Sequence, residues 1–344
     1  MLSLYTTEDK IIQLYEDGPS SIWYRIMNAP CTEISYCTKN GDNKLSNHKA
    51  FINLHRAGCK IFPDDELMQL INDDESNVRE LPNPIYLIDI DSAKANEISK
   101  KYGVIVLPKS MNEETRPAIA HRGWSVDSSE DNRSWKYILS NIETPLNSVM
   151  IIDRYLFANQ NGDTIEDSIF NLREIIGTLL PLEKVEHFNI TIIFDLSKSQ
   201  YSFEEIKKAV QKMKRHFVDT RFAFDLELIS VTSNCFGYDD THDRYIISNY
   251  FIVGAPHKLK TFSQDRGVLC KQTISFNYLF SQGIEPGDRS TKPIVTHDRI
   301  INAISKVVHH MLYESVNECD YSLNGQIIKK ENIEIKNELF LFDS

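Results

Sequence analysis

Apolar and polar residues alternate in blocks along the chain and predict an ordered series of strands and helices. Residues 84–90 form an apolar run that begins with a proline, as in a buried strand, and residues 104–107 form a second such run. Between them, residues 92–101 have the spacing of a helix, with Ser92 as its expected N-cap and Gly103 near its end. This order predicts a βαβ unit with two parallel strands.

The amino-terminal third has a mixed α/β pattern, with helices expected at residues 44–57 and 64–73. Residues 108–134 change character, because Pro, Asn, Glu, Ser, Asp and Arg dominate them, as is typical of a linker or a long loop. We therefore expect two domains, an amino-terminal α/β domain of unknown role over residues 1–125 and a second domain over residues 126–344.

Strand and helix patterns alternate more regularly in the second region. Helices are expected at residues 135–142, 165–180 and 202–217, and strands at residues 148–152, 190–194 and 224–230. Ser202 and Glu205 have the spacing of a capping box at the start of the third helix. The alternation predicts a parallel α/β sheet, and such sheets gather functional groups at the carboxyl ends of their strands.

A histidine and an arginine two residues apart, His242 and Arg244, are the main chemical signal, with Asn249 five residues further on. Strands are expected at about residues 245–248 and 250–254, and residues two apart on a strand project to the same face. A histidine can carry a phosphoryl group, and an arginine binds phosphate oxygens through paired hydrogen bonds. The pair is therefore a candidate for phosphodiester chemistry.

A purely structural interpretation of the same residues is also open. His242 would then be a strand residue bonded to backbone, and Arg244 would pair with Asp239 or Asp240 at the surface. The triplet also recurs, because His297 opens a second His-Asp-Arg sequence. Its continuation has the apolar spacing of a helix, so we expect a helix at about residues 297–315 instead of a second motif.

The order of strands and helices, followed by His-x-Arg, Asn249 and then Gly254, resembles one half of the phospholipase D superfamily over about residues 135–285. The motif of that family reads His, any residue, Lys, four residues, Asp. Here Arg244 takes the place of the lysine and keeps its charge. Asn249 takes the place of the aspartate and removes a carboxylate.

This resemblance implies an α/β sandwich that acts as a metal-independent phosphodiesterase or nuclease. His242 would attack phosphorus to form a phosphohistidine, Arg244 would bind the phosphate, and Asn249 would complete the site, with no cofactor. Two motifs meet across a two-fold interface in this superfamily, so the resemblance also implies a homodimer, with nucleic acid or phospholipid as substrate. Its metal-independent nucleases serve in bacterial defence, which implies a role against foreign DNA.

The His-Asp-Arg form is also similar to the phospholipase D-like carboxy-terminal domain of MIT-domain proteins. That similarity implies an alternative, in which the fold is a non-catalytic module that dimerises and binds a ligand or a membrane.

Four further residues are candidates to line a phosphate site. Asp153 and Arg154 directly follow the strand expected at residues 148–152, where a parallel sheet presents functional groups. His257 and Lys258 lie just beyond the motif and would add charge to a phosphate pocket. The alternatives are a salt-bridged strand end for the first pair and turn residues for the second.

The amino-terminal region offers a metal-dependent alternative. Asp89 and Asp91 flank a strand end, and paired carboxylates suit Mg²⁺, although a surface strand end explains them equally well. His48, His55 and Cys59 have helix-face spacing, but no fourth ligand is evident. We therefore assign no metal site.

The charge and the cysteine content of the chain limit its expected function and location. The net charge of −11 argues against a generic nucleic-acid coat, because non-specific binding rests on neutralisation of phosphates by Lys and Arg. The six cysteines include no CxxC pair, which favours reduced thiols. No Walker or GxGxxG sequence occurs, and no apolar run approaches the roughly 18 residues that a membrane span needs. We expect a cytoplasmic protein without an integral membrane segment.

Overall fold

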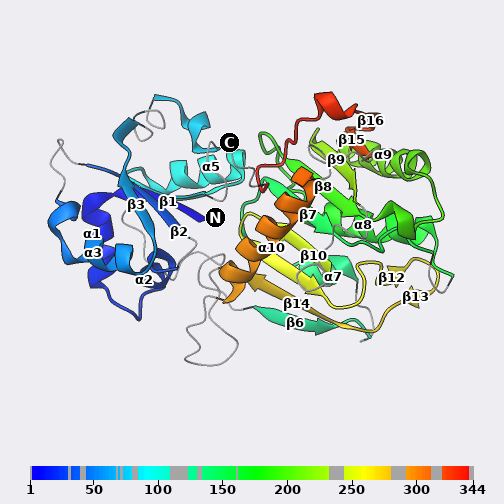
Figure 1. Cartoon of the computed structure of the whole chain (residues 1–344), viewed down its shortest axis with the longest axis horizontal. Helices are drawn as coiled ribbons and strands as arrows, with labels where there is room; N and C mark the ends of the chain where they lie inside the picture. Colours follow the sequence, from blue (N-terminus) through cyan, green and yellow to red (C-terminus); the bar gives the residue numbers. More distant parts are fainter. Residues whose placement is uncertain are drawn as a thin grey trace.

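The computed structural model describes residues 2–29, 32–38, 44–66, 69, 73–79, 84–108, 123–129, 134–159, 162–231, 244–279, 292–310 and 320–340. Within these residues the chain forms one five-stranded sheet, one nine-stranded sheet and a short two-stranded sheet, together with helices. The predicted α/β class is confirmed. Figure 1 shows the five-stranded sheet, in blue and cyan, beside the nine-stranded sheet.

The five-stranded sheet is parallel and has the order β3-β2-β1-β4-β5. Its strands are β1 (Leu2–Thr7), β2 (Thr32–Cys37), β3 (Lys60–Pro63), β4 (Pro84–Ile88) and β5 (Ile105–Pro108). Its helices are α1 (Glu8–Glu16), α2 (Ile22–Met27), α3 (Lys49–Arg56) and α5 (Ser92–Tyr102). The predicted parallel pairing of the two strands around α5 is confirmed.

Two details of this region differ from the sequence prediction. Asp91, not Ser92, is the N-cap of α5, because the Asp91 carboxylate accepts a hydrogen bond from Lys94 N at 2.9 Å. The helix predicted at 44–57 is broken at His48, whose side chain accepts from Ala50 N and starts α3 after a short 3₁₀ turn. The helix predicted at 64–73 lies partly outside the described residues.

The nine-stranded sheet has the order β16-β15-β9-β8-β7-β10-β11-β14-β6. Strands β7, β8 and β9 are parallel, as predicted, and the other pairings are antiparallel. The strands are β6 (Trp124–Asp127), β7 (Ser148–Ile152), β8 (Asn189–Phe194), β9 (Asp225–Ser230), β10 (Arg244–Ser248), β11 (Phe251–Ala255), β14 (Thr273–Tyr278), β15 (Tyr321–Leu323) and β16 (Gln326–Ile327). The predicted boundary between residues 125 and 126 passes through β6, which pairs with β14; the division into domains itself stays a prediction.

Helices cover both faces of this sheet because its strands alternate their apolar side chains. Val149 and Ile151 of β7 pack with α8 (Ile165–Leu179) and α9 (Phe203–Thr220), whereas Met150 and Ile152 face α10 (Lys292–His309). Figure 1 shows α10, in orange, lying across the sheet. The short helix α7 (Trp135–Leu139) packs beside α8.

Helix starts follow the capping pattern of the sequence in most places. The predicted Ser202–Glu205 capping box is present at α9, and Thr164 and Asp167 form a second one at α8. Helix α10 begins at Lys292, five residues before the predicted start. In the described part of the chain, no helix combines the length and the apolar character needed to cross a membrane.

Candidate functional site

Strand β10 brings the arginine of the motif to the carboxyl ends of the parallel strands. It runs antiparallel to β7, with Tyr245 opposite Ile152, so that Arg244 lies next to Asp153 at the end of β7. This is the sheet edge where α/β proteins place functional groups. His242 precedes Arg244 by two residues and lies outside the described residues.

Arg244 is buried and held on several sides. Its Nε atom lies 3.6 Å from the Oδ1 atom of Asp153, and the two side chains are 8% and 0% exposed. Its Nη1 atom donates to Pro256 O at 3.2 Å, and its guanidinium lies 5.1 Å from the ring centre of Tyr155. The surface position expected in the structural interpretation is therefore wrong; Asp239 and Asp240 lie outside the described residues.

Asp153 joins three segments at this edge. One carboxylate oxygen accepts from Tyr155 N at 2.8 Å, and the other accepts from Leu259 N at 2.8 Å. Burial raises the pKa of Asp153, while Arg244 and the two N–H groups act in the opposite direction. The carboxylate thereby fixes both the arginine and the loop that follows β11.

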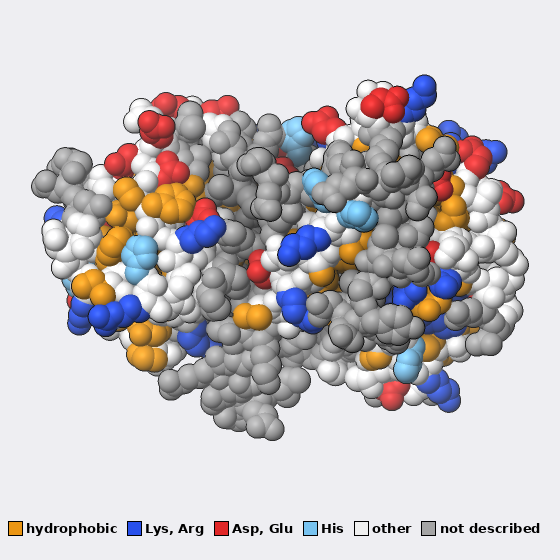
Figure 2. Space-filling model, viewed as in Figure 1, with side chains coloured by type: hydrophobic (Ala, Val, Ile, Leu, Met, Phe, Trp, Pro, Cys, Tyr) orange, Lys and Arg blue, Asp and Glu red, His pale blue; other side chains and the backbone are white. Residues whose placement is uncertain are grey.

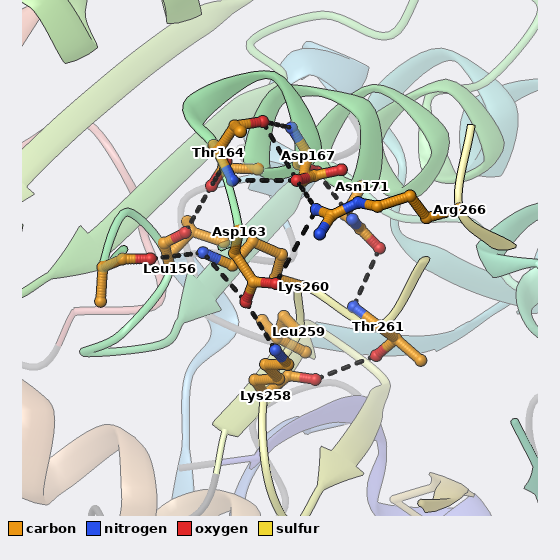
Figure 3. A network of polar contacts seen from close by, with 12 residues as sticks. Leu156, Asp163, Thr164, Asp167, Asn171, Lys258, Leu259, Lys260, Thr261 and Arg266 are labelled. Carbon is orange, nitrogen blue, oxygen red and sulfur yellow. Dashed lines mark hydrogen bonds and ion pairs between the residues drawn. The ribbon is translucent and has the colours of Figure 1, made fainter. Parts of the chain in front are cut away.

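A second charged group lies where the segment that follows β11 meets the start of α8. Asp163, which is 3% exposed, has its Oδ2 atom 2.6 Å from Lys258 Nζ and 3.6 Å from Lys260 Nζ. Figure 3 shows Asp163 and the two lysines among the polar contacts of this group. Arg266 pairs with Asp167 and lies 3.9 Å from Asp163. Burial lowers the pKa of Lys260, while Asp163 opposes this change. Of these five residues, only Lys258 was predicted from the sequence as part of a site.

Helix α8 holds the backbone of the same loop through Asn171. The Asn171 oxygen accepts from Thr261 N at 3.1 Å and Phe262 N at 3.0 Å, and its Nδ2 atom donates to Phe262 O. Trp135 Nε1 also donates to this oxygen, at 2.9 Å. The sequence signals for this cluster are two lysines two residues apart, Lys258 and Lys260, and acidic residues at the start of α8.

The other two residues predicted at this edge differ in their surroundings: Arg154 is close to a carboxylate, whereas His257 is exposed. Arg154 lies 3.9 Å from Asp195, which follows β8. His257 is exposed, and its backbone N–H donates to Gln272 at 2.9 Å. In the described residues, five cationic side chains thus face four carboxylates: Arg154, Arg244, Lys258, Lys260 and Arg266 against Asp153, Asp163, Asp167 and Asp195. The cluster is close to neutral.

Asn249 lies at the opposite end of β10 from Arg244. Its side chain is 1% exposed, and its oxygen accepts from Asn147 N at 3.2 Å and from Ser148 N at 3.0 Å. The structure therefore does not bring Asn249 together with Arg244. A carboxylate and an amide oxygen can both accept these two bonds, so the change from aspartate to asparagine is compatible with an anchoring role at the turn.

The other predicted motifs have structural partners. His297 is buried in α10, where its Nε2 atom lies 2.7 Å from Ser248 O, and burial lowers its pKa to about 4. His48 caps α3, Asp91 caps α5, and the Cys59 thiol contacts Met27 O. Across the described residues, no three His, Cys, Asp or Glu side chains cluster as they would around a metal ion.

Two surface features complete the description. A groove of about 480 Å³ runs between α5 and the segments 142–146 and 178–185, away from the charged cluster, and its lining is chiefly apolar. On the face in Figure 2, the described Lys and Arg side chains form separate groups among Asp and Glu side chains, not one continuous basic surface. That distribution agrees with the acidic composition.

Neither the scan against protein-family models nor the search of curated proteins gave a match to the chain.

Proposed function

We propose that this chain is a phospholipase D-like protein that binds phosphodiesters of nucleic acid at the carboxyl edge of β7 and β8. The observation that carries the proposal is the position of Arg244, which stands at this edge beside Asp153. Lys258 lies on the adjoining loop, which Asp153 ties to the same edge. Two cations on a fixed framework can bind the non-bridging oxygens of a phosphate.

His242 is the nucleophile in this proposal. Its ring nitrogen attacks phosphorus, the bond between phosphorus and the leaving oxygen breaks, and a phosphohistidine forms that water then hydrolyses. Arg244 stabilises the charge on the phosphate oxygens, and Asp153 is the positioning residue that holds the guanidinium. No step requires a metal ion. A second copy of the chain supplies the other motif of the site, so the active form is a homodimer.

The near-neutral cluster limits how the protein binds nucleic acid. A phosphate entering the site competes with Asp153 for Arg244 and with Asp163 for Lys258. Few phosphates would be neutralised, so the affinity for nucleic acid should fall only weakly as the salt concentration rises. On duplex DNA, the logarithm of the binding constant should fall against the logarithm of the salt concentration with a slope near −0.9 for each phosphate bound. A weak salt dependence is expected of an enzyme that contacts few phosphates, and not of a protein that coats nucleic acid.

The experiment is cleavage of labelled single- and double-stranded oligonucleotides in the presence of a chelator. His242→Ala should lower the cleavage rate roughly a thousandfold or more, as expected when a nucleophile is lost. His216→Ala, at an exposed position on α9, is the matched control and should leave the rate unchanged. Cleavage that survives His242→Ala, or that the chelator abolishes, would overturn the enzymatic proposal.

A non-catalytic module is the second candidate, and one observation favours it. The Arg244 side chain is only 8% exposed, and Asp153 already balances its charge without any ligand. In this case the parent protein binds oligonucleotides, or vesicles that contain phosphatidic acid, but cleaves neither. Binding without cleavage, unchanged in His242→Ala, would select this candidate over the enzyme.

A further inference from the structure

The turn between β10 and β11 reaches into the five-stranded sheet through Tyr250. Its hydroxyl donates to Pro84 O at 2.6 Å and accepts from Ile105 N at 3.0 Å. These are the first residues of β4 and β5, and they lie 166 and 145 positions away from Tyr250 in the sequence. The side chain is fully buried, and burial raises its pKa, so the hydroxyl stays neutral. One side chain thus joins the two sheets.

The turn between α5 and β5 also contacts the region of the nine-stranded sheet, through segments near the starts of β7 and β8. Asn147 Nδ2 donates to Tyr102 O at 3.0 Å, and Glu186 N donates to Lys101 O at 2.8 Å. Gly103 has a φ of +66°, and a Cβ atom there would lie 2.3 Å from Leu146 O. The two surfaces are therefore in contact through backbone groups as well as through side chains.

The turn between β10 and β11 is anchored to the strands of the proposed site. Ser248 Oγ accepts from Tyr250 N and Phe251 N, both at 3.2 Å, and Asn249 fastens the turn to the start of β7. Arg244 stands at the other end of β10, four residues before Ser248. A hydrogen-bonded strand thus runs without interruption from the five-stranded sheet to the charged cluster.

We infer that the five-stranded sheet controls the placement of β10 and hence of Arg244. Tyr250 is the positioning residue of this coupling, and a partner or ligand that deforms β4 or β5 changes phosphate binding at the far end of β10. The effect on binding rests on the proposed function. The coupling itself is a property of the fold and is measured without any ligand.

Hydrogen exchange of the full chain tests the coupling with Tyr250→Phe. The change removes one oxygen atom and leaves two buried backbone groups of β4 and β5 without their partner. Exchange of amides in β4, β5 and β10 should accelerate about tenfold or more. The matched control is Tyr278→Phe in β14, which is also buried and whose hydroxyl donates to Asn141 O and accepts from Glu143 N, both at 3.3 Å. It should leave β4 and β5 unchanged.

Gly103→Ala tests the same coupling from the other sheet. The new methyl group meets Leu146 O, so the turn between α5 and β5 must move away from the nine-stranded sheet. Gly58→Ala is its control, because Gly58 has a comparable φ of +86° but open space around a Cβ atom. Faster exchange in β10 with Gly103→Ala and not with Gly58→Ala supports the inference.

Two outcomes overturn the inference. One is acceleration confined to β4 and β5 in Tyr250→Phe, with β10 as protected as in the parent. The other is an equal response of β10 to Tyr250→Phe and to Tyr278→Phe. If β10 responds as expected but the parent protein binds no oligonucleotide, the proposed function fails and the coupling stands. If oligonucleotides bind and Tyr250→Phe binds them as tightly as the parent, the control over Arg244 is refuted.

Discussion

Buried polar groups have different partners at the two ends of the parallel strands β7, β8 and β9. At the carboxyl end, each buried charge has an opposite charge close by, as Asp153 has Arg244 and Asp163 has Lys258. Towards the amino end, Glu227 of β9 is fully buried, and it accepts hydrogen bonds from the hydroxyls of Thr191 and Tyr321 and from the backbone N–H of Lys336.

This difference indicates that the two ends of the sheet have different roles. An ion pair stabilises two charged side chains inside the protein, and a charged substrate can then take the place of one member of the pair. Neutral hydrogen bonds hold elements in place, and here they hold α10 through His297 and the segment around Asn337, whose amide donates to Val149 O at 3.1 Å. The proposed chemistry therefore lies at the carboxyl end, whereas the polar contacts at the amino end hold neighbouring elements against the sheet.

The largest expected effect comes from breaking the ion pair at the carboxyl end. Asp153→Ala leaves Arg244 buried without this carboxylate, and it also removes the acceptor for Tyr155 N and Leu259 N. Loss of one partner of a buried pair should lower the free energy of unfolding by about 3–5 kcal/mol. Urea unfolding measures the change.

The double variant Asp153→Leu with Arg244→Met is the control for charge. If the cost comes from the unpaired arginine, replacing both partners by apolar residues should restore much of the lost stability. A double variant as unstable as Asp153→Ala would instead assign the cost to the two backbone N–H groups. A single variant within about 1 kcal/mol of the parent would show that the pair is not buried.

The fold was predictable where periodicity and capping agree. Strand β7 was predicted with its observed limits, and the capping box at Ser202 and Glu205 placed α9, because both signals depend on neighbouring residues alone. The parallel order of β7 to β9 followed from the helices between them. Strands β6 and β14 were missed, because pairing across long sequence separations has no local signal.

The candidate site was predictable only in part, for a similar reason. Asp153 and Arg244 were named from separate segments, but their contact depends on β10 pairing with β7. Asp163, Lys260 and Arg266 were missed, because their charges become notable only when folding brings them together. Asn249 was assigned to catalysis by its place in the motif, whereas its contacts depend on a turn that the motif does not describe.

A smaller, pH-dependent effect is expected at the amino end from His297. Its folded-state pKa of about 4 lies below the usual value of 6.5, so the unfolded chain binds a proton first as the pH falls. The stability associated with the neutral ring is therefore complete above pH 6.5 and is lost between pH 6.5 and about 4, by roughly 3 kcal/mol. His297→Gln, which can still donate to Ser248 O, should reduce this loss in urea unfolding. His216→Gln, at an exposed position, should not, and equal pH profiles for both variants would refute the assignment.

A pH-dependent effect of opposite sign is expected from Glu227. Burial raises the pKa of this carboxyl, so the folded protein binds its proton more tightly than the unfolded chain does, and stability falls as the pH rises above the ordinary range of Glu through the folded-state pKa. Glu227→Gln keeps the shape and removes the titration, and the hydroxyls of Thr191 and Tyr321 can accept as well as donate. The variant should therefore gain stability relative to the parent as the pH rises from 4 to 8. A difference that stays constant over this range would mean that Glu227 is ionised with no cost, and the contrast between the two ends of the sheet would then lose its electrostatic basis.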